Sequence, residues 1–327
     1  MKKNITKLSA FLLVLLLGIT SISFPCQAKP KTTGMNVQYH SQKDIRKFVK
    51  NHKFDTNTQV DYAKKPSVKS SSYRAGELKK SSLNQGLKAL NTMRYIAGVP
   101  ANVKLDKSYN KKCQAAALVN AANQELSHFP RKPNKMPNAL YKLGFEGAGS
   151  SNLAMTSWSG NLAYNVVWQW MADDDVSNID RVGHRRWILN PAMKKTGFGS
   201  VNNYAAMYAF DGNFADTQYY GVAWPAQNMP IEYFSDSMPW SISMGKPVKE
   251  SKVKVTLTRK RGKKTKKWTF SSKKSNGYFN VENSYYGQQG CIIFRPKNIS
   301  YRAGDTFKVK ITGLDETVSY QVKFFKL

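Results

Sequence analysis

The chain is 327 residues long and strongly basic, with 51 Lys and Arg against 20 Asp and Glu and a formal net charge of +31. This length is enough for two modest domains with hydrophobic cores. The charge indicates polyanionic partners, such as cell-wall phosphate polymers, anionic lipids or acidic glycans, and the alternative is general solubility and surface adhesion without a specific partner. Zinc-finger spacings and basic helices leading into heptads are absent, which argues against a specific nucleic-acid-binding protein.

Residues 1–28 have the composition of a secretory leader, or signal peptide. Three lysines flank the start of an apolar run from Leu8 to Leu17, and the small residue Ala28 ends the segment. The residues before Cys26 lack the small side chains that precede a lipid-attachment cysteine. We therefore expect cleavage after Ala28 and a secreted or cell-wall-associated product, with no membrane-spanning segment and a net charge of +28 once three lysines are removed from +31.

Residues 29–82 are predicted to be a basic, polar and partly flexible lead-in. One short piece of it places Ile45, Phe48 and Val49 on one helical face.

Three helices are predicted after residue 82. The first has apolar residues at helical spacing and stops at Gly98-Val99-Pro100, and the second is alanine-rich and begins at Asp106, a good N-cap. The third has an apolar face that includes Trp170, and the chain then reaches a run of aspartates.

Short β-like runs follow Pro191, so helices come first and strands afterwards, which favours an α+β architecture. Residues 225–249 contain four prolines and are predicted to be a connector. Residues 250–327 contain six strand-like runs at short spacing, which predict a small all-β, Ig-like sandwich domain.

The loop between the first two of these strands is very basic. Nine of the sixteen residues from Lys252 to Lys267 are Lys or Arg. We take this loop as a candidate polyanion-binding patch, and the alternative is a solvated hairpin tip. Its residues are Lys260, Arg261, Lys263, Lys264, Lys266 and Lys267.

A set of short motifs occurs in a fixed order between residues 83 and 224. They are LN..R...G in the first helix, a histidine at the end of the second, NLA, WM, and GHRRWILNP followed by TGFG. In their order and spacing these motifs resemble the CAP superfamily (cysteine-rich secretory protein, antigen 5 and pathogenesis-related proteins; SCP-like extracellular domain) in its bacterial secreted form. The resemblance implies an α-β-α sandwich with a central cleft over residues 83–224.

The resemblance also implies that two histidines and two acids line this cleft. His128 and His184 match the histidines. The first acid of the family pattern is replaced by Ser151, and the second corresponds to Asp173, next to Asp174 and Asp175. This departure puts in doubt any function that needs both acids.

Two imidazoles and one carboxylate are a partial zinc site, because stable sites have three or four protein ligands. We therefore expect His128, His184 and Asp173 to bind zinc weakly at most, and the alternative is that both histidines only make structural hydrogen bonds. Calcium binding by the aspartates is disfavoured, since the spacing is not that of an EF-hand. No other cofactor is expected.

Other candidates are weaker. Ser151 is not in a nucleophile elbow, and Cys113 and Cys291 are either paired or buried free thiols. Trp158 and Trp168 could line a groove for a small apolar or lipid ligand.

The combined prediction is a secreted protein that acts by binding at the cell surface or in the medium, with no established catalysis. Two alternatives remain: a metal-assisted hydrolase that uses His128, His184 and Asp173, and a cell-wall adhesion protein whose basic C-terminal domain is the functional part.

Overall fold

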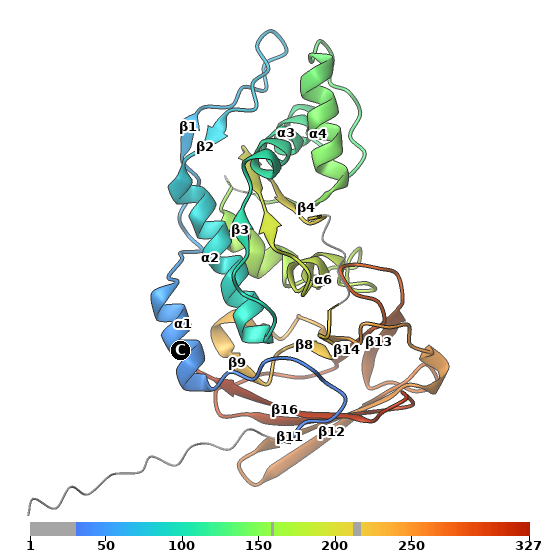
Figure 1. Ribbon diagram of the computed structural model, residues 1–327. Coiled ribbons are helices and arrows are strands. Elements are labelled where there is room, and N and C mark those ends of the chain that lie inside the picture. Colours follow the sequence, from blue (N-terminus) through green and yellow to red (C-terminus); the bar gives the residue numbers. More distant parts are fainter. Residues whose placement is uncertain (1–30, 158–159, 212–216) are drawn as a thin grey trace, which may run out of the picture.

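The computed structural model describes residues 31–157, 160–211 and 217–327. Helices dominate the first half of the described chain, and strands dominate its last third (Figure 1). The predicted leader, residues 1–28, lies outside the described residues. Within the described ranges, no helix is long and apolar enough to cross a membrane.

The three helices predicted after residue 82 are present, and two further α-helices lie at Asn138–Gly149 and Gly183–Ile188. Asp106 caps the helix Lys107–Asn123 by accepting hydrogen bonds from the backbone N–H groups of Ser108 and Tyr109. The helix Asn138–Gly149 begins within a proline-rich stretch that the sequence indicates to be a loop. The helical elements are α1 (Gln42–Asn51), α2 (Lys80–Ala97), α3 (Lys107–Asn123), α4 (Asn138–Gly149), α5 (Leu162–Tyr164), the π-helical η1 (Asn165–Trp170), α6 (Gly183–Ile188), and the 3-10 turns η2 (Ile231–Tyr233) and η3 (Glu250–Lys252).

Helix α1 lies in the segment predicted to be a partly flexible lead-in, yet it is docked on α2. Ile45 is 1% exposed, and the ring of Phe48 stacks on Tyr95 of α2 with centroids 3.9 Å apart. Ser41 and Asp44 form a capping box at its N-terminus. The structure differs from the prediction here because the apolar face of α1 is buried by a helix further along the chain.

A three-stranded antiparallel sheet lies among the helices of the first half, in the order β4 (Ser151–Met155), β7 (Tyr204–Tyr208), β6 (Phe198–Val201). α3 packs on β6 and β7, α4 packs on α3, and α2 packs on α5 and η1. Two small sheets complete this part: β1 (Tyr62–Lys64) with β2 (Glu77–Leu78), and β3 (Lys104–Leu105) with β5 (Lys195–Thr196).

All six strands predicted after residue 250 are present. They are β11 (Lys254–Arg261), β12 (Lys264–Phe270), β13 (Gly277–Glu282), β14 (Cys291–Pro296), β15 (Thr306–Thr312) and β16 (Val318–Phe325). Together with β8 (Val222–Trp224), β9 (Asn228–Pro230) and β10 (Trp240–Ser243), they form a four-stranded sheet in the order β13-β14-β10-β8 and a five-stranded sheet in the order β12-β11-β15-β16-β9.

The two sheets pack against each other through aromatic side chains. Trp240 of the four-stranded sheet contacts Phe307 of the five-stranded sheet at a centroid distance of 5.3 Å, and Phe270 and Phe294 lie 5.0 Å apart. These rings are fully buried. The C-terminal part of the chain is therefore β-rich and built around a large aromatic core.

The segment predicted to be a connector, residues 225–249, differs from that prediction because it contains β9 and β10. β9 pairs in parallel with the last strand, so that Asn228 lies opposite Lys323. Partners this far apart in sequence leave no local signal, and the prolines hide the strand pattern. The domain boundaries drawn from the sequence remain predictions.

Candidate functional site

His128 lies just after α3, and its ring is held by the end of α4. Its Nδ1 is 2.9 Å from the carbonyl oxygen of Ala148. A carbonyl only accepts, so Nδ1 carries the proton and the neutral ring has its lone pair on Nε2. Desolvation of the ring is the largest cause that lowers the pKa of His128, and the charges of His184 and Arg181 lower it further, against the opposing effect of the Ala148 hydrogen bond.

His184 is the second residue of α6 and is held by Asp173. Its Nδ1 is 2.8 Å from Oδ1 of Asp173, and Oδ2 of the same carboxylate accepts a hydrogen bond from the backbone N–H of Arg185 at 2.9 Å. Asp173 is 1% exposed. Both carboxylate oxygens are therefore used inside the protein, and Asp173 fixes the tautomer and direction of the His184 ring. The role of Asp173 as a direct metal ligand stays a prediction.

Asp173 itself and a residue just before His184 both have a left-handed backbone conformation. Asp173 has φ 44°, and Val182, the residue before α6, has φ 43°. A β-branched residue rarely adopts such a conformation, because its side chain crowds the backbone. The surrounding packing therefore maintains strain where His184 enters its helix.

Ser151 lies away from His184. The Ser151 hydroxyl is 3.6 Å from the sulfur of Cys113, which belongs to α3. Successive side chains of β4 point to opposite faces, and the next residue, Asn152, donates from Nδ2 to the carbonyl oxygen of His184 at 3.0 Å. Sequence reasoning missed Asn152, because alternation places Ser151 and Asn152 on opposite faces of β4 but does not show which of the two faces His184.

The thiols are not reactive groups here. Cys113 and Cys291 are both free and buried. Burial raises the pKa of the Cys113 thiol to about 12, so it stays protonated at neutral pH.

Both arginines of the GHRRWILNP motif have structural contacts. The guanidinium of Arg185 is fully buried, and the Nη2 of Arg186 donates to the carbonyl oxygens of Ser284 and Gln288, each at 2.6 Å. Trp187 packs its ring on Phe210, with centroids 4.6 Å apart. The segment around His184 is thus anchored in the protein at several points.

The other candidates of this region are dispersed. Asp174 accepts from the Ser237 hydroxyl, and Asp175 accepts from Asn178. Trp168 is partly buried against the core, and Trp158 lies outside the described residues. Among the described residues, no group of three His, Cys, Asp or Glu side chains could hold a metal ion.

The six residues of the predicted polyanion patch all belong to the β11–β12 hairpin, but they differ in their contacts and exposure. Arg261 is bound to the buried carboxylate of Asp305 through Nε and Nη2, each at 2.6 Å. Lys266 lies over the ring of Trp268, 4.9 Å from its centroid. Lys260, Lys263, Lys264 and Lys267 are exposed.

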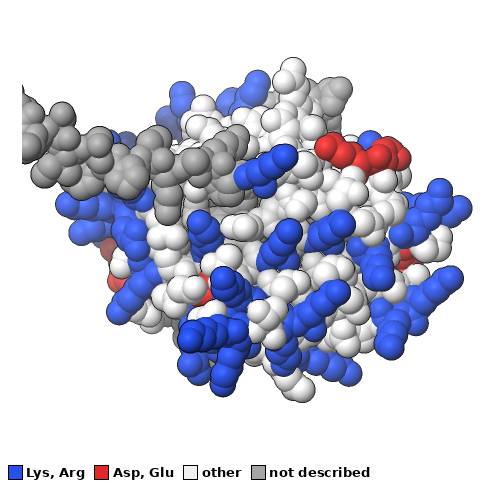
Figure 2. All heavy atoms as spheres, turned by 90° about the horizontal axis from the view of Figure 1, so that it is seen from below, with Lys and Arg blue, Asp and Glu red and all other residues white. Residues whose placement is uncertain are grey.

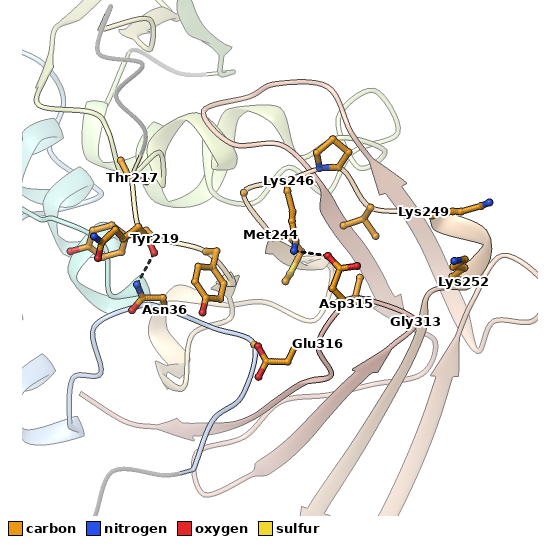
Figure 3. A pocket seen from close by; sticks show the side chains of 17 residues that line it. Asn36, Thr217, Tyr219, Met244, Lys246, Lys249, Lys252, Gly313, Asp315 and Glu316 are labelled. Carbon is orange, nitrogen blue, oxygen red and sulfur yellow. Dashed lines mark hydrogen bonds and ion pairs between the residues drawn. The ribbon is translucent and has the colours of Figure 1, made fainter.

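A cavity of about 970 Å³ lies elsewhere, between the N-terminal segment and three loops (Figure 3). Lys246 and Asp315 form an ion pair across it, with Nζ 2.7 Å from Oδ2, and Asn36 donates to the carbonyl oxygen of Gln218 beside it. Sequence reasoning missed this cavity, because its walls come from four distant segments of the chain.

Stability is expected to fall between pH 7.5 and pH 5, in part through His128. Its folded pKa lies below the reference value of 6.5, so in that interval the unfolded chain binds more protons and stability rises with pH. Urea unfolding at both pH values should show a smaller loss for His128→Gln than for the wild type. Equal losses would assign the effect to other groups, such as His40, whose pKa is also lowered by desolvation.

Comparison with known protein families identifies the central part of the chain. The model of the cysteine-rich secretory protein family, CAP, matches residues 87–220. This range contains His128, Asn152, Asp173 and His184. The chain matches no curated protein and no solved structure.

Proposed function

Residues 87–220 form a CAP domain, and from this premise we propose that the chain is exported through its leader and acts by binding a ligand outside the cell. A CAP domain is an extracellular-type binding domain whose ligand here is unknown. We further propose that the helices around β4, β7 and β6 make an α-β-α sandwich, followed by an Ig-like sandwich of the two larger sheets.

One observation carries the binding function. The Nδ1 atoms of His128 and His184 are engaged by protein acceptors at 2.9 and 2.8 Å, which leaves each neutral ring an Nε2 lone pair for a ligand. The charge of His184 is also one of the causes that lower the pKa of His128, after desolvation of the ring. The hydroxyl of Ser151, the nucleophile candidate from the sequence, contacts the sulfur of Cys113 instead.

The donors present do not complete a zinc site of ordinary affinity. Two imidazole nitrogens are available, and the one nearby carboxylate holds His184 from behind rather than offering a third ligand. Asp173 would orient His184 toward a bound cation, as carboxylates commonly orient metal-ligating histidines.

Zinc binding is expected to be weak and to need both histidines. Calorimetry on the wild type at neutral pH should give a Kd above about 1 μM, because the site lacks a third protein ligand. His128→Ala and His184→Ala should each abolish the binding heat, whereas Lys142→Ala, an exposed change on α4, should leave it unchanged. Wild-type binding by both histidine variants would show that no shared site exists, and a Kd far below 1 μM would show that a further ligand is present.

A metal-assisted hydrolase is the second candidate, and the Asp173–His184 pair favours it. A buried carboxylate 2.8 Å from Nδ1 fixes the orientation of the ring and the tautomer that leaves Nε2 free to accept a proton or a cation. Zinc-stimulated hydrolysis of a peptide or ester panel that is lost in His184→Ala would support this candidate. Zinc binding without hydrolysis of any substrate in the panel would exclude this candidate for those substrates and favour the binding function.

A further inference from the structure

Lysine and arginine side chains are spread over the outer face of the five-stranded sheet (Figure 2). Leu257, Val309 and Val322 point inward and are fully buried, so the alternate residues of their strands point outward. The outward lysines of β11, β12, β15 and β16, named here the lysine face, are Lys254, Lys260, Lys267, Lys308, Lys310 and Lys323.

The strand register places hydroxyl and amide side chains between these lysines in each row across the sheet. One row across the sheet reads Thr265, Lys260, Thr306, Lys323. The next reads Lys267, Thr258, Lys308, Gln321, and a third reads Thr269, Thr256, Lys310, Ser319. In these rows no lysine lies directly opposite another, which avoids the destabilisation that directly opposed like charges cause.

The charge of the lysine face has no compensating acid in its own strands. None of β11, β12, β15 and β16 contains Asp or Glu. Asp305, which engages this hairpin, is buried and bound to Arg261. The outward lysines therefore present their charge to solvent.

Edge protection does not explain this pattern. Lysines are common on edge strands, where they block pairing with other chains. Lys308 and Lys310 lie instead on β15, the central strand of the order β12-β11-β15-β16-β9, and β11 beside it is also internal. These strands have no free edge to protect, so the positive charge at the centre of the sheet needs another explanation.

We propose that the lysine face binds a linear phosphodiester polymer. Outward positions two residues apart on a strand, such as Lys308 and Lys310, are separated by about 6.8 Å, which suits consecutive phosphates of a flexible polymer. The interleaved threonines, with Ser319 and Gln321, can hydrogen-bond phosphate oxygens and polyol hydroxyls between them. This surface lies outside the CAP domain and acts independently of the histidine cleft.

The composition of the face selects among anionic partners. Its exposed outward positions carry no aromatic ring that could stack on a nucleic-acid base and no large apolar side chain that could insert into a membrane. Phe325 has the same parity in β16, but it is only 4% exposed and lies under the guanidinium of Arg46 from α1. A polymer of phosphate and polyol units fits this combination of cations and hydroxyls.

The test compares two triple variants of equal charge change. The face variant is Lys260→Gln, Lys308→Gln, Lys310→Gln. The control is Lys107→Gln, Lys111→Gln, Lys142→Gln, three exposed lysines of α3 and α4 at the opposite end of the molecule (Figure 1). The probe is synthetic poly(glycerol phosphate), with binding measured by calorimetry at several salt concentrations, and thermal unfolding checks that every variant is folded.

The face variant should lose about tenfold or more in affinity, and the control less than about twofold. The slope of log affinity against log salt should fall by about 2 in the face variant, since each lost phosphate contact contributes about 0.7 for a flexible single-stranded polyanion. His184→Ala should bind the polymer as the wild type does. Failure of the proposed ligand binding at His128 and His184 would therefore not affect this result.

Three outcomes would overturn the proposal. Equal losses in the two triple variants would mean that the net charge acts diffusely. Dependence on the three face lysines for phosphatidylglycerol vesicles but not for the free polymer would assign the face to a lipid surface. Tighter binding of single-stranded DNA than of the polyol polymer, lost in the face variant, would assign it to nucleic acid.

Discussion

Replacing Arg185 with methionine is expected to lower the free energy of unfolding by about 3–5 kcal/mol. The guanidinium is fully buried. It donates to the carbonyl oxygens of Met171, Ala172 and Pro239 at 2.7, 2.6 and 2.7 Å, and to the Ser241 hydroxyl at 3.0 Å. Methionine fills similar space but donates nothing, so four buried acceptors would lose their donor.

This loss is large because native domains are stable by only about 5–15 kcal/mol. It would also loosen the contact between the two parts of the chain, since Ser241 belongs to β10 and Arg185 follows His184 in α6. The matched control is Arg181→Met, a partly exposed arginine whose Nη2 donates to the carbonyl oxygen of Ser177. It should cost less than about 1 kcal/mol.

Urea unfolding followed by circular dichroism and by tryptophan fluorescence measures both changes. A loss near that of the control would show that the acceptors of Arg185 find other donors or water. In that case the contact with β10 would not contribute to stability as the buried geometry indicates.

Gly199→Ala is expected to be the second large change, with a loss of about 3 kcal/mol or more, or failure to fold. A Cβ at this position would lie 2.2 Å from the carbonyl carbon of Cys113 and 2.2 Å from the backbone nitrogen of Gln114. Both atoms belong to the backbone of α3, so relief requires the whole helix to move. Two hydrogen bonds between Gln114 and Ser200, at 2.8 and 3.0 Å, hold the helix against β6.

The control is Gly149→Ala, at the end of α4, where a Cβ would approach nothing closer than 3.7 Å. That distance is an ordinary van der Waals contact, and alanine is favoured over glycine in a helix. The change should therefore be neutral or slightly stabilising. Thermal unfolding and the yield of soluble protein give both results, and a folded Gly199→Ala with unchanged melting temperature would contradict the close packing of α3 on β6.

Several features of this protein could be predicted because they depend on local sequence. Apolar residues at helical spacing and the Asp106 cap predict α2 and α3, and alternation predicts the six strands from β11 to β16, all of which are present. The ordered motifs predict the CAP domain, which the family match confirms. His128 and His184 were also selected from these motifs, but their function stays a prediction.

Other features depend on which segments meet in space. No local pattern shows that Asn152 rather than Ser151 faces His184, or that both oxygens of Asp173 are engaged inside the protein. The strand β9 within the predicted connector and the docking of α1 within the predicted lead-in could not be foreseen for the same reason, since both are stabilised by partners far along the chain.

The lysine face shows the division most clearly. Period-two alternation in the sequence alone determined that Lys308 and Lys310 lie on one side of their strand and that Val309 lies on the other. Only the tertiary structure decided that Lys260 and Lys323 flank Thr306 in one row, because the register between strands is set by turns and by long-range burial of the opposite face. The sequence thus determines the net positive charge of this protein, whereas strand pairing determines which lysines lie together on one surface.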